Sequence, residues 1–346
     1  MIKNKKIYSL GLTIMDNSAA ALFCNGKLIA AVEEERLSRI KNDNNFPHNS
    51  IKEVLDIEGI QLQNINNIAV YWQPWRIFTR GYGTLKKLLN SPDSLKSVSL
   101  KVKKLFTPSE KSQDGSWFDL FRIKKILEKS HGKFNGKIYF FNHHLTHQKY
   151  GEIITNDKSF ISLSYDGGGE SDSTVLSVVL DGKRIILKKH KWPNSLGHFY
   201  SFFTGFLGFK MLEGEYKMMG LSPYGKPIYK EKILSNILKL KRNGSYQLNT
   251  NLCDYHSALR GIFSKEIIRL FGERRSTNEE PSQMHIDLAC SVQASFEEAL
   301  NHILKPAFVK FPYIKNIVIT GGCALNVTAN GKLLSNNLVD KVIIPP

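Results

Sequence analysis

The sequence predicts an α/β protein built from two similar lobes with one helical insertion. Its 346 residues, 42% hydrophobic and 23% charged, are enough to bury two moderate cores. The first part of the chain carries strand-like runs around a tight hairpin turn, followed by an amphipathic helix and a further strand. Elements of the same kinds return in the second part, although no sequence repeat is visible.

The elements of the first lobe are indicated by hydrophobic patterning and turn residues. Three strands open the chain, and Asn25-Gly26 between the last two is typical of a two-residue hairpin turn. The predicted strands are 7–14, 19–24, 27–32 and 68–72, and the predicted helix is 49–59, ending at a glycine. This order is typical of the opening of an RNase H-like or actin-like lobe.

The second lobe is predicted from a second series of strands and hairpins. Strand signals resume at 137–141 and continue at 160–165, 174–180 and 184–189. A helix at 284–304 leads to a strand at 314–319 and to a helix from about Asn326. We therefore expect a first actin-like lobe at residues 1–150 and a second at 151–346.

Residues 73–137 differ from the flanking segments in composition, with basic amphipathic stretches at 85–89 and 101–105 and a polar break near 108–116. We predict that they form an inserted helical cap on the first lobe. Its cationic faces could attract an acidic partner or a lipid, although charged helix faces are more often simply solvated.

Charge and hydropathy limit the function classes. The chain has 48 Lys and Arg against 31 Asp and Glu, and its net charge of +17 is compatible with nucleic acid, an anionic membrane or phosphorylated substrates. The most apolar stretch, around 202–209, is too short and interrupted to span a bilayer, and the N-terminus lacks the features of a signal peptide. We therefore expect a cytoplasmic protein without a membrane partner. The four cysteines form no CxxC pair, so a thiolate zinc site is not expected.

The first candidate for chemistry is the run His143-His144-Leu145-Thr146-His147, directly after a predicted strand. If a helix begins here, His143 and His147 share one face and can reach one metal ion, while His144 points elsewhere. Iron, zinc or manganese would require a carboxylate ligand as well. The alternative is a set of structural histidines.

The second candidate is Asp166 at the end of a predicted strand, followed by Gly167, Gly168 and Gly169. Such a turn can expose backbone N–H groups that hold phosphate oxygens, and Asp166 would then meet the phosphates through a metal ion. The alternative is a hairpin turn that requires positive φ angles.

The third candidate is Gly321-Gly322 between a strand and a helix, with Asn326 near the helix start. The glycines let a nucleotide approach the backbone, and Asn326 can cap the helix or bond a ribose or base. Together with the turn at Asp166, this segment predicts a nucleotide cleft between the lobes.

The fourth candidate is the segment 214–225, in which Glu215 and Lys217 are framed by glycines. Packing alone does not readily explain these two charged residues. The aromatic run that precedes them, at 196–203, is most simply part of the core.

These motifs occur in the order found in one known family. Besides HHxxH and DGGGE, the matching segments are residues 11–21, EEERLSR at 33–39, Phe46-Pro47, EGEYKMMGLSPYG at 213–225 and GGCALNVTANG at 321–331. Together they resemble the motifs of the nodulation and antibiotic-biosynthesis O-carbamoyltransferases. The resemblance spans nearly the whole chain and implies an actin-like (ASKHA) fold related to the universal tRNA threonylcarbamoyl-transferase subunit. Members form carbamoyl-adenylate from carbamoyl phosphate and ATP and pass the carbamoyl group to a hydroxyl of a sugar or antibiotic scaffold.

The resemblance also implies roles for single residues. It makes His143 and His147 iron ligands and Asp166 a ligand that also faces the nucleotide phosphates. Lys41 resembles the active-site lysine, which neutralises charge on the donor or on a developing oxyanion. It also implies that Gly167, Gly168 and Asn326 line the nucleotide. From the motifs described above we expect five further cofactor-binding residues, Gly169, Glu215, Lys217, Gly321 and Gly322. The implied cofactors are Fe(II) or another divalent metal, ATP or carbamoyl-adenylate, and Mg²⁺ for adenylation.

Two departures from the family pattern concern histidines. Met15-Asp16 stands where the family usually has His-Asp, and Lys41-Asn42-Asp43 where it has Lys-His-Asp. An imidazole that could help acid–base chemistry is therefore absent, so the rate or the acceptor can differ or activity can be lost. The alternatives are an inactive or split-gene nucleotide- or metal-binding partner and, with no recognised RNA motif to support it, a tRNA-binding module.

The last departure is at the C-terminal end. Family members continue beyond the position of Pro346 with a glycine-rich segment that supplies another metal ligand, and with a second domain that makes carbamoyl-adenylate. We expect a chain that lacks both and that requires a separate domain or subunit for the full reaction. A shortened chain, a split gene and a decayed copy all stay open as explanations.

Overall fold

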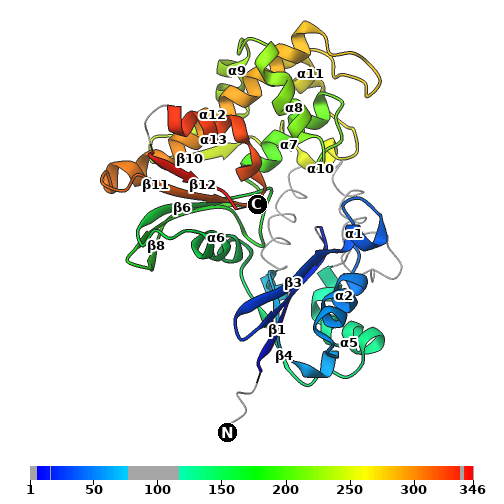
Figure 1. Ribbon diagram of the computed structural model, residues 1–346. Coiled ribbons are helices and arrows are strands. Elements are labelled where there is room, and N and C mark those ends of the chain that lie inside the picture. Colours follow the sequence, from blue (N-terminus) through cyan, green and yellow to red (C-terminus); the bar gives the residue numbers. More distant parts are fainter. Residues whose placement is uncertain (1–5, 16, 77–116, 336–338, 346) are drawn as a thin grey trace. The chain divides into compact units, whose positions relative to one another are not determined.

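The chain divides into two compact units in the computed structural model, which describes residues 6–15, 17–76, 117–335 and 339–345. Unit 1 is Met1–His143 and unit 2 is His144–Pro346. Each unit contains one five-stranded sheet with helices packed on it (Figure 1).

Unit 1 is built on a mixed sheet with the strand order β3-β2-β1-β4-β5. Its strands are β1 (Tyr8–Thr13), β2 (Ala19–Cys24), β3 (Lys27–Glu33), β4 (Ile65–Val70) and β5 (Lys137–Phe140). Its helices are α1 (Glu34–Ser38), α2 (His48–Glu58) and α5 (Trp117–His131), with short 3-10 turns η1 (Leu62–Asn64) and η2 (Pro74–Arg76). The first three strands pair antiparallel, whereas β4 and β5 are parallel to β1.

Helices α2 and α5 of unit 1 contribute buried apolar residues to the core of that unit. Helix α2 ends where Gly59 adopts a left-handed conformation, as the sequence predicts. Helix α5 contributes Leu120, Ile123 and Leu127 to the same core. The last part of the predicted insertion is therefore a core element of unit 1, and residues 77–116 of that insertion lie outside the described residues.

Unit 2 repeats the topology of unit 1. Its sheet has the order β12-β11-β6-β7-β8, formed by β6 (Phe160–Tyr165), β7 (Asp172–Leu180), β8 (Lys183–Lys191), β11 (Asn316–Thr320) and β12 (Lys341–Ile343). Again the first three strands in chain order are antiparallel and the last two are parallel to the first. In both units chain order therefore places the strands as 3-2-1-4-5, which confirms the predicted pair of actin-like α/β lobes.

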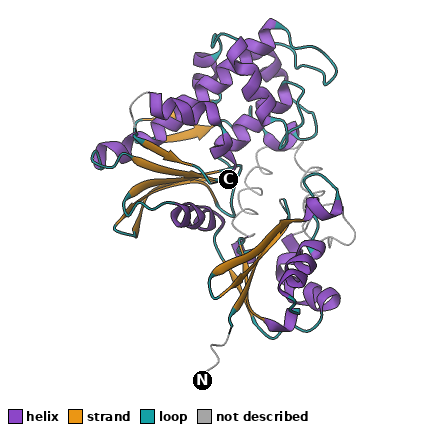
Figure 2. Ribbon diagram, in the orientation of Figure 1, coloured by secondary structure: helices purple, strands orange, loops and turns teal. Residues whose placement is uncertain are grey.

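Helices cover both faces of the second sheet (Figure 2). Helix α6 (His143–Ile154) lies on one face, and α12 (Gln283–Lys310) and α13 (Val327–Ser335) lie on the other. The remaining elements are α7 (Leu196–Phe206), α8 (Glu215–Leu221), η4 (Ser222–Tyr224), α9 (Lys230–Asn236), β9 (Leu238–Lys241), β10 (Ser245–Leu248), α10 (Tyr255–Ala258), α11 (Lys265–Phe271) and η5 (Gly322–Leu325).

Aromatic side chains of α7 form much of the core of unit 2. Phe199, Phe202 and Phe203 are fully buried, which confirms the interpretation of this run as core. Helix α12 continues past its predicted end at Leu304 and through Pro306, because Ala307 beyond the proline is also buried in this core. Within the described ranges, no helix is both long and apolar enough to cross a membrane.

Candidate metal and nucleotide site

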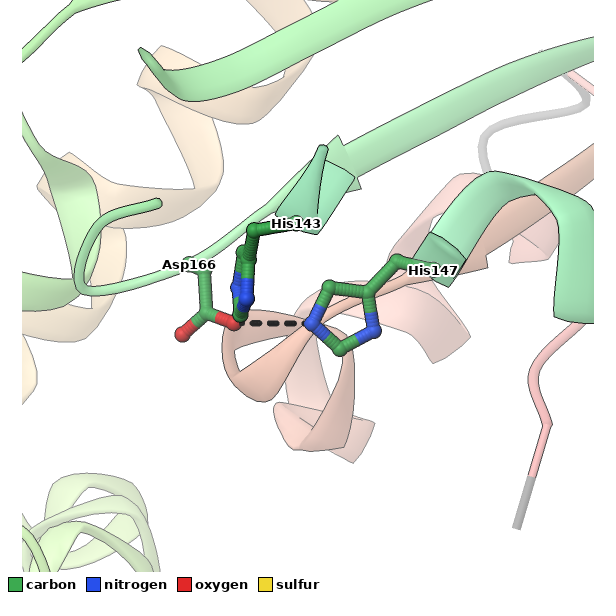
Figure 3. A group of neighbouring side chains, drawn as sticks. All are labelled: His143, His147 and Asp166. Atoms are coloured by element: carbon green, nitrogen blue, oxygen red, sulfur yellow. Dashed lines mark ion pairs between the residues drawn. The ribbon is translucent and has the colours of Figure 1, made fainter. Parts of the chain in front are cut away.

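Three side chains with metal-binding atoms meet where α6 begins and β6 ends. His143 is the first residue of α6, so the expected helix places His143 and His147 on one face. Asp166 directly follows β6. Ligand atoms of the three residues lie within 4.8 Å of one another, and Nε2 of His147 is 3.2 Å from Oδ2 of Asp166 (Figure 3).

The donor set fits a divalent metal ion. Two imidazole nitrogens and one carboxylate oxygen suit iron, zinc or manganese better than calcium or magnesium, which prefer oxygen alone. His143 is buried, whereas His147 and Asp166 are partly exposed, so the group is open on one side. Three protein ligands would leave coordination positions for a substrate or for further ligands.

His144 faces away from this group. Its Nε2 lies 2.9 Å from the carbonyl oxygen of Asp172 and its Nδ1 lies 2.8 Å from Oγ of Ser164. A carbonyl can only accept, so Nε2–H donates and the neutral ring accepts from the serine hydroxyl at Nδ1. His144 is therefore a buried structural histidine that ties α6 to the sheet.

The glycine turn after Asp166 is closed by its own hydrogen bonds. The N–H of Asp166 donates to the carbonyl of Ser173 at 3.0 Å, and that of Gly169 donates to the carbonyl of Asp172 at 2.8 Å. The N–H of Gly167 donates to Oδ1 of Asp166 at 2.7 Å. The amides of Gly167 and Gly169 are thus engaged inside the turn, and a phosphate at Gly167 would have to compete with the aspartate.

The N-terminal turn of α7 packs directly on this loop. Ser195 caps α7 by accepting from the N–H of His198, and its hydroxyl also donates to the carbonyl of Asp166 at 2.9 Å. A Cβ on Gly197 would come within 2.6 Å of the backbone nitrogen of Gly167, so only glycine allows this approach. This contact is not predicted from the sequence, in which a capping serine two residues before a glycine is its only signal.

The glycines at 321 and 322 lie beside the same turn. Strands β6 and β11 are parallel neighbours, so both end at one edge of the sheet. Gly321 has φ of +90°, and a Cβ there would meet the carbonyl oxygen of Tyr165 at 2.4 Å. A Cβ on Gly322 would lie 3.0 Å from Oδ1 of Asp166. The structure thus brings the second and third predicted segments together.

Asn326 is engaged as a helix cap. Its Oδ1 accepts from the N–H of Ala329 at 2.9 Å in the first turn of α13. Its amide also exchanges two hydrogen bonds with the amide of Gln293, which in turn accepts from the Tyr200 hydroxyl and donates to Glu297. Of the two roles that the sequence leaves open, capping is thus observed directly.

Glu215 and Lys217 differ in their surroundings. The Glu215 carboxylate accepts from Oγ of Ser201 at 2.5 Å and from the N–H of Leu212 at 2.8 Å, in a turn where Leu212 has φ of +69°. It therefore holds the connection between α7 and α8. Lys217 is exposed, with Nζ 5.9 Å from the centre of the Tyr216 ring.

Lys41 and Met15 belong to unit 1. Lys41 is exposed on the turn after α1, and the next residue, Asn42, has φ of +54° and donates its N–H to Oε2 of Glu35 at 2.8 Å. Met15, which stands where the resembled family usually has a histidine, is partly buried against the core of unit 1.

Cys323 lies near the carboxylates of this site. Desolvation, together with the negative carboxylates of Asp166 and Glu215, raises the pKa of the Cys323 thiol well above its ordinary value. The protein therefore favours the neutral thiol at pH 7.

Fold and site together define a two-lobed actin-like protein with a candidate His–His–Asp metal site. The family described as carbamoyltransferase N-terminus matches residues 6–346, and the chain belongs to it. The nodulation protein NolNO of Sinorhizobium fredii is 31% identical over 96% of this chain and 44% of its own length. An uncharacterized Synechocystis protein is 32% identical over 95% of this chain and 52% of its own length. The chain thus spans about half the length of these relatives.

Similarity to solved structures is more distant. Component A of the (R)-2-hydroxyglutaryl-CoA dehydratase of Acidaminococcus fermentans has a TM-score of 0.47 at 13% sequence identity. That similarity covers 98% of this chain and 92% of the dehydratase component.

Proposed function

We propose that this chain is the transferase part of an O-carbamoyltransferase that moves a carbamoyl group from carbamoyl-adenylate to a hydroxyl of a sugar or natural product. Membership of the carbamoyltransferase family over residues 6–346 supports carbamoyl transfer. The grouping of His143, His147 and Asp166 is the single observation that supports chemistry within this part of the protein. It brings together the histidine motif and the aspartate–glycine turn, with His147 and Asp166 19 positions apart along the chain, as ligands of one metal ion.

The proposed reaction is an acyl transfer between two oxygens. The acceptor oxygen attacks the carbonyl carbon of carbamoyl-adenylate and forms a new C–O bond. The bond from that carbon to the phosphate oxygen breaks, and AMP leaves with the electron pair. The proton of the attacking hydroxyl passes to solvent, and the products are a carbamate ester and AMP.

His143, His147 and Asp166 would hold Fe(II) or another divalent ion. Such an ion, when bound, supplies a Lewis acid for the carbonyl or phosphate oxygen. Asp166 faces the nucleotide phosphates in this proposal, and Lys41 neutralises negative charge that develops on the donor.

The nucleotide would lie along the edge where β6 and β11 end. The proposed lining there is Gly167, Gly168, Gly169, Gly321, Gly322 and Asn326. Gly169 and Asn326 would shape this edge rather than bond the nucleotide directly, since their polar groups already have partners. For the same reason Glu215 would hold its turn, whereas the exposed Lys217 is free to approach phosphate charge.

The donor itself would be formed from carbamoyl phosphate and ATP with Mg²⁺ by a further domain or a separate subunit. The curated relatives are about twice as long as the matched segment, which is compatible with such a division. The acceptor is proposed only by class, as a hydroxyl-bearing sugar or natural product.

Metal content and nucleotide binding test the proposal directly. Elemental analysis and calorimetry with carbamoyl-adenylate are applied to the wild type, to His143→Ala/His147→Ala, and to the control His302→Ala, whose ring hydrogen-bonds to carbonyl groups of the β9–β10 hairpin. We expect about one metal ion per chain and nucleotide binding in wild type and control, and loss of both in the double variant. A wild type that binds neither, even with added iron, contradicts the proposal.

A non-catalytic metal- or nucleotide-binding subunit is the second candidate. The packing of Met15 against the core favours it, because a thioether there offers no acid–base group. AMP release that depends on an added acceptor hydroxyl, measured with carbamoyl-adenylate as donor, separates the two candidates and rejects this one.

A further inference from the structure

Helix α6 presents polar side chains to the sheet of unit 2. His144, Gln148 and Glu152 follow at intervals of four and therefore share one face of the helix. The first two are only 1% and 2% exposed, and the Glu152 side chain is 16% exposed. We call these three residues the polar stripe.

Hydrogen bonds attach the polar stripe to three strands. His144 contacts Ser164 of β6, as described above. Gln148 Nε2 donates to the carbonyl of Val175 at 3.1 Å and lies 3.2 Å from Oγ of Ser177, both on β7. The guanidinium of Arg184 on β8 donates to Oε1 of Gln148 and to Oε1 of Glu152. Each residue of the stripe thus has a defined partner on the sheet.

A glycine brings the helix close enough for these bonds. A Cβ on Gly151 would lie 2.5 Å from Cγ1 of Val318 and 2.9 Å from Cγ2 of Thr320 on β11. A larger residue here would require a shift of α6 or of these two β11 side chains. The close approach lets the short Gln148 side chain reach backbone carbonyls of the strands.

The polar stripe fixes the rotation of α6 in a way that apolar packing would not. Apolar contacts are non-directional, so a helix held by them alone tolerates small rotations, whereas hydrogen bonds require particular atoms at particular angles. His143 and His147 each precede a stripe residue by one position, which is about 100° around the helix. The rotation set by the stripe therefore decides where both imidazoles point.

The strand partners link this rotation to the aspartate. Ser164, which binds His144, lies on β6 two residues before Asp166. We propose that Gln148, with His144 and the Glu152–Arg184 pair, is a positioning residue that holds His143 and His147 in register with Asp166 for metal binding. This inference rests on the metal site of the proposed function and adds the residues that orient its ligands.

Cobalt(II) binding tests the inference without any activity assay. Gln148→Leu removes the polar contacts of Gln148 within the stripe. Gln293→Leu is the matched control, since Gln293 is a similarly buried glutamine that hydrogen-bonds to Tyr200, Glu297 and Asn326, away from α6. We expect Gln148→Leu to weaken cobalt binding about 10- to 100-fold, the usual effect of lost support for metal ligands, and to change the visible absorption of the bound ion. The control keeps the wild-type affinity and spectrum.

Two further results complete the test. Should Gln148→Leu fail to fold, Ser177→Ala leaves α6 intact, removes one partner of Gln148 and is expected to weaken cobalt binding to a smaller extent. Equal affinity and identical spectra in the Gln148 and Gln293 variants would overturn the positioning role and leave the metal site standing. A wild type that binds no cobalt would overturn both.

Discussion

His147 and Asp166 meet with Nε2 of the imidazole 3.2 Å from Oδ2 of the carboxylate. One residue lies in the second turn of α6 and the other follows β6, so the contact depends on how the helix is seated on the sheet. At this distance the two groups can share a proton or bind one metal ion. Replacement of the carboxylate distinguishes the two cases, because it lowers metal affinity only if Asp166 is a metal ligand.

Asp166→Asn is expected to lower affinity for zinc or iron at least tenfold. The amide keeps the size of the side chain but removes the negative charge that a divalent ion requires from this donor set. Competition with a chromophoric chelator measures the change. Asp157→Asn is the control, because Asp157 forms an exposed ion pair with Lys341 and should leave metal affinity unaltered. Equal affinities in both variants would argue against a metal at Asp166.

The elements predicted best from the sequence are those whose patterns are local. Strands β2 and β6 have the predicted bounds, because alternating or fully apolar runs are bounded by turn residues. Helix α2 begins one residue earlier than predicted and ends at the predicted glycine. The predicted end of α12 at Leu304 was wrong. Pro306 is a local stop signal, whereas the burial of Ala307, which favours continuation of the helix, depends on the tertiary fold.

Gly197→Ala is expected to destabilise the protein by about 1–3 kcal/mol, as overpacking commonly does. The added methyl would meet backbone atoms of Gly167, which cannot rotate away as a side chain can. Gly220→Ala in α8 is the matched control, since a Cβ there meets nothing within 4 Å. It should leave stability unchanged or raise it by up to ~1 kcal/mol. Urea unfolding of both variants measures the difference, and similar losses would contradict the close packing at Gly197.

The candidate site was only partly accessible from the sequence. His143, His147 and Asp166 could be named because their residue types are typical metal ligands at suitable spacing. The contacts that support them could not, because Gln148 and Gly197 carry no reactive group. A buried helix face is also expected to be apolar, so the polar stripe gave no signal for burial.

Glu34→Ala is expected to lower the free energy of unfolding by about 2–4 kcal/mol. The Glu34 carboxylate, which belongs to α1, accepts hydrogen bonds from the N-terminal end of α2. It accepts from the N–H and side chain of Asn49 at 3.0 and 2.7 Å, and from the N–H and hydroxyl of Ser50 at 2.8 Å each. Pro47, at the N-cap, offers no side-chain bond. Glu53→Ala on the exposed face of α2 is the control and should change the free energy of unfolding by less than ~0.5 kcal/mol. A comparable loss in both would refute the capping role.

Stability is expected to fall as the pH is lowered from about 6.5 toward 4, and His190 is one cause. Burial, with Lys188 and His302 nearby, lowers the pKa of His190 from 6.5 to about 4. Between these values the unfolded chain binds a proton that the folded chain does not, so the unfolded state gains stability as protons are added. The contribution of His190 is therefore complete above pH 6.5 and is lost as the pH falls through 4. It amounts to on the order of 3 kcal/mol.

His190→Phe separates this contribution from other acid effects. The ring of His190 stacks on Tyr246 with centroids 4.5 Å apart, and phenylalanine can keep that contact without a titrating group. Stability measured by urea unfolding at several pH values should fall less steeply in the variant between pH 6.5 and 4. Part of the slope will persist, because burial and the nearby His48 also lower the pKa of His131 to about 4. Parallel pH profiles for variant and wild type would contradict the lowered pKa of His190. A histidine that is neutral in the folded protein between pH 6.5 and 4 must make the wild-type curve steeper.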